Sequence, residues 1–219
     1  MTHGLQSRDA PRGPLAGIGV VVTRPVRQAA AFVQQLAALG ATPIAWPAIV
    51  ILPPDDRAPL ARVHATLERY DFAFFVSANA AEYGVPPVGR WPKRLRTYAP
   101  GPGTATALAS VGIPGARIPE ANFDSEGILA LPELAQLDGK RAIVFRGQGG
   151  REHLSRTLGA RGATVETVNC YRRAAPSGDA RGLLEAISLR RDNVLTLTSA
   201  EGIDNLMRAA GDAGRAALT

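Results

Sequence analysis

The chain has 219 residues, a hydrophobic content of 46% and a net charge of +6. That length suffices for one large or two small domains, and no apolar run approaches the roughly 20 residues of a membrane-spanning helix. Residues 1–14 are polar and lack the apolar centre of a secretory signal, so we expect a flexible tail on a cytoplasmic protein without a membrane partner. The lone Cys170 excludes an internal disulfide and a multi-cysteine metal site.

The positive charge comes from an excess of arginine and indicates either an acidic small molecule or nucleic acid as the ligand. An arginine-rich composition without any ligand explains the charge equally well. The chain has few aromatic residues, no zinc-knuckle spacing and no lysine-rich run. We therefore expect no nucleic-acid partner and favour a small acidic ligand.

The stretch 15–54 occurs a second time, without a gap, as 137–176. Both copies read as an apolar strand, an arginine, a small loop, an amphipathic helix, a glycine and a second strand. The matched positions include Arg24 with Arg146, 40–42 with 162–164, and, further along, Ser77 with Ser199. A repeat of this length predicts a duplicated α/β half.

In chain order, strands and helices alternate. Short apolar runs predict buried parallel strands at 19–23, 72–76, 97–99, 142–145 and 194–198. Helical spacing of apolar residues predicts helices around 29–39, 60–67, 105–111, 128–134, 154–158, 183–187 and 203–207. The extended stretches 44–52 and 165–173 are interpreted as crossing strands, and the prolines in and after the first exclude it from the interior of a sheet.

The repeat also predicts what lies at the end of the chain. By its offset, the counterpart of 97–111 would fall beyond Thr219, so the second half would lack a strand, a turn and a helix. We therefore expect the strand 194–198 to lie beside an open position of its sheet. Apolar surface near Ile203 and Leu206 should then be exposed.

No Ser/His/Asp set, pair of catalytic carboxylates or metal cluster emerges from the spacing, so we expect neither a metal nor a cofactor. The loop 147–150 is rich in glycine, but no Gly-Lys-Ser/Thr follows it and Glu152 breaks the dinucleotide fingerprint. The loop from Gly101 to Thr104 is better placed to offer N–H groups to an anion at a helix start. A tight turn that simply needs glycine explains that loop equally well.

Hydroxyls, an amide and arginines remain at or near the predicted strand ends, where open parallel sheets bind ligands. These candidates are Arg24, Ser77, Asn79, Thr104, Arg146, Tyr171 and Ser199. They would converge if two α/β units face each other. Tyr171 lies on a crossing strand beside Arg172 and Arg173, and a half-buried structural tyrosine is an equally good interpretation of it.

Six short motifs follow one another along the chain. They are Val21-Val22-Thr23-Arg24-Pro25, Phe75-Val76-Ser77-Ala78-Asn79-Ala80, Gly101-Pro102-Gly103-Thr104-Ala105, Asn122-Phe123-Asp124-Ser125-Glu126-Gly127, Val168-Asn169-Cys170-Tyr171-Arg172 and Leu197-Thr198-Ser199-Ala200. Each is weak alone, but their order and spacing resemble the uroporphyrinogen-III synthase family from about Leu15 to the end. Pro100 departs from the small apolar residue usual in that family.

This resemblance implies an α/β fold with two similar parallel-sheet domains that exchange halves and are joined by a two-stranded β connector. Domain 1 would comprise 15–45 plus 175–219, discontinuous and, by the repeat, truncated at its C-terminus. Domain 2 would comprise 52–168. The connector strands would be 46–54 and 168–176.

The resemblance also implies an enzyme, a cyclising hydro-lyase of haem and porphyrin biosynthesis. It would convert the linear tetrapyrrole hydroxymethylbilane to uroporphyrinogen III, with inversion of ring D through a spiro intermediate and loss of water. We expect a monomer acting without a cofactor. Tyr171 matches the family tyrosine that helps the substrate hydroxyl to leave, and Ser77, Thr104 and Ser199 match polar positions that line the cleft.

The complete predicted site has Tyr171 as the catalytic residue and seven substrate-binding residues: Arg24, Ser77, Asn79, Gly101, Thr104, Arg146 and Ser199. Eight carboxylates on the substrate suit an arginine-rich cleft. The alternative is a non-enzymatic two-domain binding protein for an acidic small molecule, and a nucleic-acid binder ranks third. Separation of the product isomers would discriminate between them.

Overall fold

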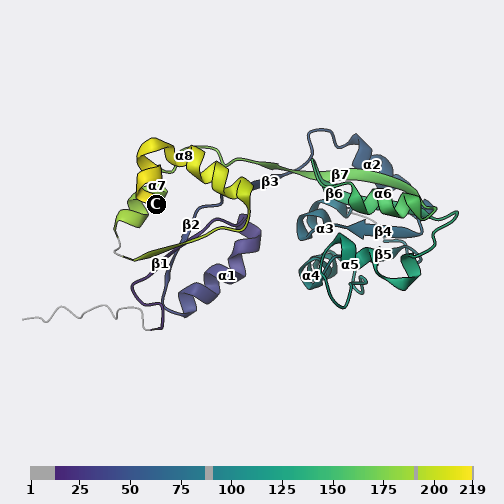
Figure 1. Ribbon diagram of the computed structural model, residues 1–219, viewed down its shortest axis with the longest axis horizontal. Coiled ribbons are helices and arrows are strands. Elements are labelled where there is room, and N and C mark those ends of the chain that lie inside the picture. The colour runs from purple at the N-terminus through teal and green to yellow at the C-terminus, as the bar shows by residue number, and fades with distance from the viewer. Residues whose placement is uncertain (1–12, 87–90, 190–191, 219) are drawn as a thin grey trace, which may run out of the picture. The chain divides into compact units, whose positions relative to one another are not determined.

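The computed structural model describes residues 13–86, 91–189 and 192–218. The chain divides into two compact units: unit 1 comprises the chain up to Val50 and from Ala174 onward, and unit 2 comprises Ile51–Arg173. Each unit contains parallel strands with helices packed against them (Figure 1). The predicted α/β class is therefore confirmed. Of the tail predicted at 1–14, residues 1–12 lie outside the described residues.

In the part of unit 1 that the structure describes, three strands form the sheet. The central strand β1 (Gly19–Val22) pairs in parallel with β2 (Thr42–Ala45) on one side and β8 (Asn193–Thr196) on the other. All four residues of β1 are buried. This matches the expectation from the continuous apolar run, because a parallel strand covered on both faces cannot alternate polar and apolar residues.

Helices cover both faces of this sheet. Val20 and Val22 face the cluster formed with α1 (Val26–Ala38), whereas Val21 packs with residues of α7 (Arg181–Ser188) and α8 (Ala200–Leu218). After α1, Gly40 adopts a φ of 88°, the left-handed conformation that ends many helices. The helix α8 is interrupted at Gly211, where φ is 63°.

Unit 2 holds the larger sheet, whose described strands lie in the order β3-β7-β6-β4-β5. The strands β5, β4, β6 and β7 are parallel neighbours. The bounds are β3 Val50–Leu52, β4 Phe72–Phe75, β5 Arg96–Tyr98, β6 Arg141–Gly147 and β7 Thr164–Ala174. The carboxyl ends of four parallel strands thus meet at one edge, where ligands bind in such sheets.

Side-chain alternation along β4 divides the core of unit 2 into two layers. Phe72 and Phe74 pack in the cluster with α5 and α6, whereas Ala73 and Phe75 pack with α2, α3 and α4. Phe75 stacks on Phe145 of β6 at a centroid distance of 4.5 Å. The helices are α2 Ala58–Ala65, α3 Ala78–Gly84, α4 Pro102–Ser110, α5 Ser125–Leu129 and α6 His153–Ala160, with 3-10 turns at Leu67–Arg69 and Pro132–Leu134.

A β-bulge interrupts the pairing of β6 with β7. Arg146 pairs with Asn169, but the next residue, Gly147, pairs with Tyr171, so Cys170 is the extra residue of the bulge. A bulge re-aims the side chains that follow it. Cys170 and Tyr171 consequently both join the core layer of α2, α3 and α4, whereas strict alternation would have placed them on opposite faces.

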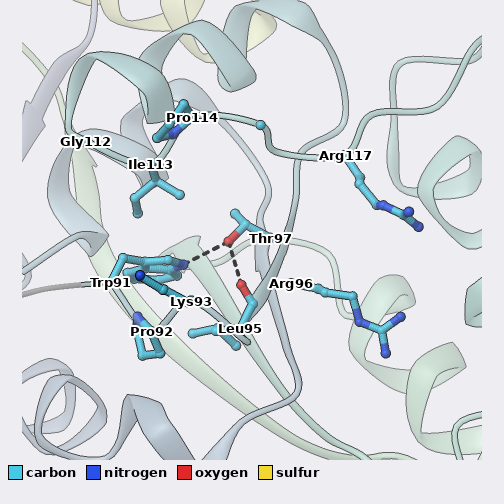
Figure 2. Close-up of a pocket in the computed structure, with 11 residues that line it drawn as sticks. Trp91, Pro92, Lys93, Leu95, Arg96, Thr97, Gly112, Ile113, Pro114 and Arg117 are labelled. Atoms are coloured by element: carbon cyan, nitrogen blue, oxygen red, sulfur yellow. Dashed lines mark hydrogen bonds between the residues drawn. The ribbon is translucent and has the colours of Figure 1, made fainter.

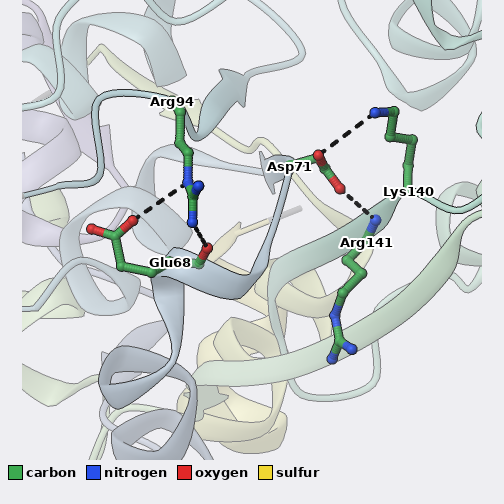
Figure 3. Close-up of polar contacts among 5 residues, drawn as sticks. All are labelled: Glu68, Asp71, Arg94, Lys140 and Arg141. Atoms are coloured by element: carbon green, nitrogen blue, oxygen red, sulfur yellow. Dashed lines mark hydrogen bonds and ion pairs between the residues drawn. The ribbon is translucent and has the colours of Figure 1, made fainter.

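Polar contacts close the amino-terminal end of this sheet (Figure 3). Oδ2 of Asp71 accepts a hydrogen bond from the backbone N–H of Arg141 at 2.9 Å, and Nζ of Lys140 lies 3.8 Å from Oδ1. Arg94 donates to the backbone carbonyl of Glu68 and pairs with its carboxylate at 3.6 Å. The Asp71 contact joins the starts of β4 and β6, so it supports the register of the two central strands.

Two expectations from the sequence are wrong. The stretch 44–52 is not one crossing strand: β2 and β3 belong to different sheets and are separated at 46–49, where Pro47 has no N–H to donate. Leu206 is fully buried against Val21, although β8 ends its sheet among the described strands as expected. Ile203, in contrast, is 38% exposed.

The extended segments nearest to the predicted connectors 46–54 and 168–176 are β3 and β7. The connector itself stays a prediction, as do the domain bounds 15–45 plus 175–219 and 52–168. Among the helices of the described ranges, none is both long and apolar enough to cross a membrane.

Candidate functional site

A cavity of about 260 Å³ opens at the carboxyl ends of β4 and β6, beside the bulge of β7. We call it the inner cavity. Val76, directly after β4, Val144 of β6 and Leu154 of α6 form its apolar wall. Its polar wall consists of Ser77, Ser125, Arg146, Arg151, Tyr171 and Arg173. Three of the eight predicted site residues, Ser77, Arg146 and Tyr171, thus meet in one place.

Ser77 caps the amino terminus of α3. Its Oγ accepts a hydrogen bond from the backbone N–H of Ala80 at 3.1 Å, the usual role of an N-cap serine. The same Oγ lies 3.2 Å from the hydroxyl oxygen of Tyr171, and either oxygen can donate in that contact. Because the Ala80 N–H already donates to Ser77, the serine proton is available to point at the tyrosine oxygen.

Tyr171 is held rigidly and is only 5% exposed. Its ring lies close to β6 at Gly147, where an added Cβ would lie 2.5 Å from Cζ of the tyrosine. On another side the ring of Tyr83 approaches with a centroid distance of 6.4 Å. These contacts fix the position of the ring, so the hydroxyl group of Tyr171 lies at the wall of the inner cavity.

The cavity is electropositive. Arg146, Arg151 and Arg173 line it, and no acidic side chain is among its described lining residues. Arg146 makes long contacts of 3.4 Å to the carbonyls of Gly147 and Arg151, weak by the usual geometry of hydrogen bonds. Arg151 is exposed and lies 3.6 Å from Glu126. Such a wall suits a ligand that carries carboxylates.

Cys170 lies next to the catalytic candidate but is not a nucleophile. Burial raises the pKa of its thiol to about 12. The protonated Sγ lies 3.3 Å from the carbonyl of Arg146, to which it donates a weak hydrogen bond. A cysteine acts as a nucleophile through its thiolate, so this one fills space in the bulge.

Three predicted residues of unit 2 do not line the inner cavity: Asn79, Gly101 and Thr104. Asn79 lies in the first turn of α3, and Gly101 is the N-cap of α4, which follows β5. A Cβ added to Gly101 would lie 2.9 Å from Cβ of Phe123, so close packing already explains this glycine. Thr104 is 8% exposed in the first turn of α4.

The two predicted residues of unit 1 repeat the arrangement of Arg146 and Ser77. Arg24 directly follows Thr23 after β1, and Ser199 precedes α8 after the neighbouring strand β8. The Ser199 Oγ accepts from the backbone N–H of Gly202 at 3.1 Å, as Ser77 does from Ala80 in unit 2. The duplicated half therefore carries the same arginine and the same serine cap in both units.

The sequence did not indicate eight of the residues that line the inner cavity. They are the apolar Val76, Val144 and Leu154, together with Ser125, Gly147, Gly150, Arg151 and Arg173. Gly147 ends β6, and 148–151 form the loop after it. The glycines of this segment suggested only phosphate binding. The signal that could have identified this loop as part of the site is its position directly after a parallel strand. Arg173 lies two residues after Tyr171 on β7, so the two side chains share a face of the strand, and the bulge before Tyr171 decides which face that is.

A second cavity, of about 400 Å³, lies near the amino-terminal end of β5 (Figure 2). Trp91 donates from Nε1 to Oγ1 of Thr97 at 3.0 Å, while Arg96 and Arg117 extend away from the indole. The guanidinium of Arg96 covers the ring of Phe72 at 4.5 Å, and Arg117 pairs with Glu133. These arginines are already engaged, so this cavity is the weaker candidate. In the part of the chain described here, no group of His, Cys, Asp and Glu forms a metal site.

Parallel sheets covered by helices, with hydroxyls and arginines at the carboxyl ends of the strands, are typical of α/β proteins that bind or convert small acidic ligands. A family model described as uroporphyrinogen-III synthase HemD matches residues 30–219. The chain therefore belongs to the uroporphyrinogen-III synthase family, a family of enzymes.

Curated relatives agree with this assignment. The chain is 37% identical over 189 residues to the uroporphyrinogen-III synthase of Salmonella typhimurium, covering 84% of this chain and 76% of the relative. It is 34% identical over 195 residues to that of Escherichia coli K12, with 86% and 78% covered.

The fold agrees as well. A crystal structure of a mutant uroporphyrinogen III synthase from the extreme thermophile Thermus thermophilus matches with a TM-score of 0.55 and 21% identity, covering 92% of this chain and 81% of that one.

Proposed function

We propose that this protein is a uroporphyrinogen-III synthase, which cyclises hydroxymethylbilane to uroporphyrinogen III with inversion of ring D and loss of water. The observation that carries the proposal is the hydrogen-bonded pair of Ser77 and Tyr171 beside Arg146, in a chain that belongs to this family. A cytoplasmic location and a monomeric state are predictions that go with it.

The first step breaks the bond between the hydroxymethyl carbon and its oxygen. Tyr171 donates its proton to the departing oxygen, which leaves as water, and the substrate becomes a cationic azafulvene. Ser77 turns its hydroxyl proton toward the tyrosine oxygen and stabilises the negative charge that develops there. The substituted carbon of ring D then attacks the cation and forms the spiro intermediate.

Rearrangement of that intermediate closes the macrocycle with ring D inverted. The carbon of ring D at which the macrocycle closes then loses its proton, and this proton restores the Tyr171 phenol, so the net change is loss of one water. An unassisted azafulvene closes to the uninverted isomer. The enzyme must therefore hold a folded conformer of the substrate, and positioning carries more of the catalysis than acid strength does.

Substrate binding is assigned to Arg146 and Ser77 in unit 2 and to their repeat partners Arg24 and Ser199 in unit 1. Asn79, Gly101 and Thr104 follow β4 and β5, whose carboxyl ends lie at the same edge of the unit 2 sheet as the inner cavity. We assign them to parts of the substrate that extend beyond this cavity.

The proposal includes exchanged halves of a duplicated unit, joined by a two-stranded connector. It is supported by the strand pairing: β8 follows the second copy of the repeat but pairs with β1 of the first, and β4 follows the first copy but pairs with β6 of the second.

Incubating the purified protein with hydroxymethylbilane and separating the product isomers tests the proposal. The expected product is uroporphyrinogen III, formed faster than the uncatalysed closure. Production of the uninverted isomer at the uncatalysed rate would overturn the enzymatic assignment. Binding of the substrate under those conditions would favour the alternative, a non-enzymatic binding protein for an acidic small molecule.

Tyr171→Phe keeps the ring against Gly147 and removes only the hydroxyl. We expect the rate to fall by roughly 10² to 10⁴, the usual contribution of a general acid. The product should stay uroporphyrinogen III because the arginines are untouched. Tyr83→Phe is the matched control, since the Tyr83 hydroxyl donates to the carbonyl of Ile51 and does not line the inner cavity. Equal rates for the two variants would remove the acid role of Tyr171.

A further inference from the structure

Another concave surface, distinct from the cavity near β5, adjoins the inner cavity and shares Arg146 with it. We call it the outer groove. It has a volume of about 630 Å³ and lies between α6 and β7 (elements labelled in Figure 1). Its walls are Arg146 of β6, four residues at and along α6, and three alternate residues of β7. The α6 residues are Glu152, Ser155, Arg156 and Gly159, and the β7 residues are Val165, Thr167 and Asn169.

The polarity of the outer groove follows from two periodicities. On α6, Leu154 and Leu158 point into the core, which leaves Ser155, Arg156 and Gly159 to face the groove. On β7, Thr167 and Asn169 are exposed, although parallel strands between neighbours are usually covered by apolar contacts on both faces. The bulge after Asn169 turns Tyr171 to the other face. The ring of Tyr171 therefore packs on one face of the sheet, whereas Thr167 and Asn169 line the groove on the other face. Arg146 lines both the groove and the inner cavity.

The chemistry of the groove suits carboxylates. Arg146 and Arg156 supply two guanidinium groups, against the single carboxylate of Glu152. Oγ of Ser155 and Oγ1 of Thr167 are 3.1 Å apart, so one hydroxyl donates to the other and the second hydroxyl keeps its proton for a ligand. The amide of Asn169 adds donors. Guanidinium and hydroxyl donors arranged in this way bind carboxylate oxygens well.

The size of the substrate requires more surface than the inner cavity offers. The inner cavity, at about 260 Å³, falls below the roughly 300 to 1,000 Å³ of pockets for drug-sized ligands. Hydroxymethylbilane has four pyrrole rings and eight carboxylates. Its reacting end fits beside Tyr171, and most of its acidic arms must be bound elsewhere.

We propose that the outer groove is a subsite for the carboxylate arms of the tetrapyrrole, with Arg146 bridging the reacting end and these arms. The proposal rests on the function proposed above. In this arrangement Arg156, Ser155 and Asn169 bind and position the substrate without taking part in proton transfer. Loss of the subsite should therefore raise KM and leave kcat and the product isomer nearly unchanged.

Gly159 offers a sharp test because it lies inside α6 and an added Cβ meets nothing within 4 Å. Gly159→Glu places a carboxylate in the groove, whereas Gly159→Gln adds the same bulk without charge. Gly182→Glu is the control, since Gly182 lies in α7 of unit 1 and its Cβ position is equally open. All three replacements have better helix propensity than glycine, so the variants should fold.

For Gly159→Glu we expect KM for hydroxymethylbilane to rise roughly tenfold or more, the scale of one lost charge-assisted hydrogen bond. Gly159→Gln should give a smaller rise and Gly182→Glu none. Arg156→Gln should also raise KM about tenfold, whereas Arg62→Gln, at an exposed arginine of helix α2, should not. Equal KM values for these variants and their controls, with wild-type protein active, would overturn the subsite and leave the enzyme assignment intact.

Binding measurements keep the subsite testable without turnover. Uroporphyrin III, the stable oxidised form of the expected product, carries the same eight carboxylates, and its Kd can be measured by calorimetry. Gly159→Glu and Arg156→Gln should each weaken binding about tenfold relative to their controls. Unchanged Kd values would refute the groove. A third outcome is that wild-type protein forms no uroporphyrinogen III while the two variants bind uroporphyrin III more weakly than their controls. That outcome would refute the proposed reaction and retain the groove as a polycarboxylate site.

Discussion

β4 and β8 occupy matching positions in the duplicated half, yet only β4 is buried. β4 lies between β5 and β6, and each of its residues is at most 1% exposed. β8 ends its sheet among the described strands, and its Val194 is 50% exposed. The repeat pairs Phe75, fully buried, with Leu197, which is 37% exposed. The pattern of apolar residues thus predicts a strand, whereas the strands on each side of it determine how deeply it is buried.

The N-cap hydrogen bonds, in contrast, are the same in both units although their surroundings differ. Ser77 and Ser199 both accept from the N–H three residues later, at 3.1 Å in each case. A cap depends on the residue and the helix that follows, not on what covers the sheet. Comparing the units therefore separates effects of packing, which should differ, from effects of local bonding, which should be equal.

The largest expected difference comes from truncating the matched pair in the core. Phe75→Ala removes a ring stacked on Phe145, and we expect the free energy of unfolding of unit 2 to fall by about 3 to 5 kcal/mol. Leu197→Ala should cost unit 1 roughly 1 kcal/mol or less, because the leucine is already partly exposed. Equal losses would show that β8 is covered in solution.

The two tryptophans allow each unit to be followed alone in these experiments. Trp46 is partly buried and packs against the core of unit 1, and the ring of Trp91 lies 5.7 Å from that of Phe75 in unit 2, measured between centroids. They are the only tryptophans of the chain. Denaturant unfolding of Trp46→Phe reports unit 2, and that of Trp91→Phe reports unit 1.

A second difference should appear at high pH. Burial, together with a hydrogen bond to Glu166, raises the pKa of Tyr70 from 10.0 to about 12, so the folded state favours the protonated phenol. Its contribution to stability is complete below pH 10 and is lost as the pH rises toward 12. The free energy of unfolding of unit 2 should fall by on the order of 2 kcal/mol over that range.

Cys170 should add to this loss from pH 9 upward, because burial raises its pKa from 9.0 to about 12. Unit 1 contains no tyrosine, cysteine or lysine, so its stability should stay nearly constant over the same range. Tyr70→Phe should flatten the slope for unit 2 between pH 10 and 12. An unchanged slope in that variant would assign the alkaline loss to other groups.

Elements governed by local rules could be predicted from the sequence. The motif around Asp124 is one case, because aspartate is a preferred N-cap residue, and here its carboxylate accepts from the N–H of Gly127 at 2.8 Å. The glycine ending α1, Gly40, is another. These features depend on a few consecutive residues and on backbone conformations that few residue types adopt.

Features that depend on a partner strand could not be predicted. The bulge at Cys170 exists only in the pairing of β7 with β6, and it decides which face receives Tyr171. The burial of Leu206 depends on which face of α8 meets Val21. For the site, the sequence indicated Ser77, Arg146 and Tyr171, but Arg151 and Ser125 reach the cavity only through the fold.

The smallest expected effect on stability should be equal in the two units. Ser77→Ala and Ser199→Ala each remove one N-cap acceptor, and each should lower the stability of its own unit by about 1 kcal/mol. Single-tryptophan unfolding curves measure both losses. Ser77→Ala should in addition slow turnover, because Ser77 also contacts the Tyr171 hydroxyl. Ser77→Thr keeps a hydroxyl acceptor at that position and should restore most of the stability. A much larger loss in one unit would show that its serine does more than cap a helix, since the two hydrogen bonds have the same length and the same donor position.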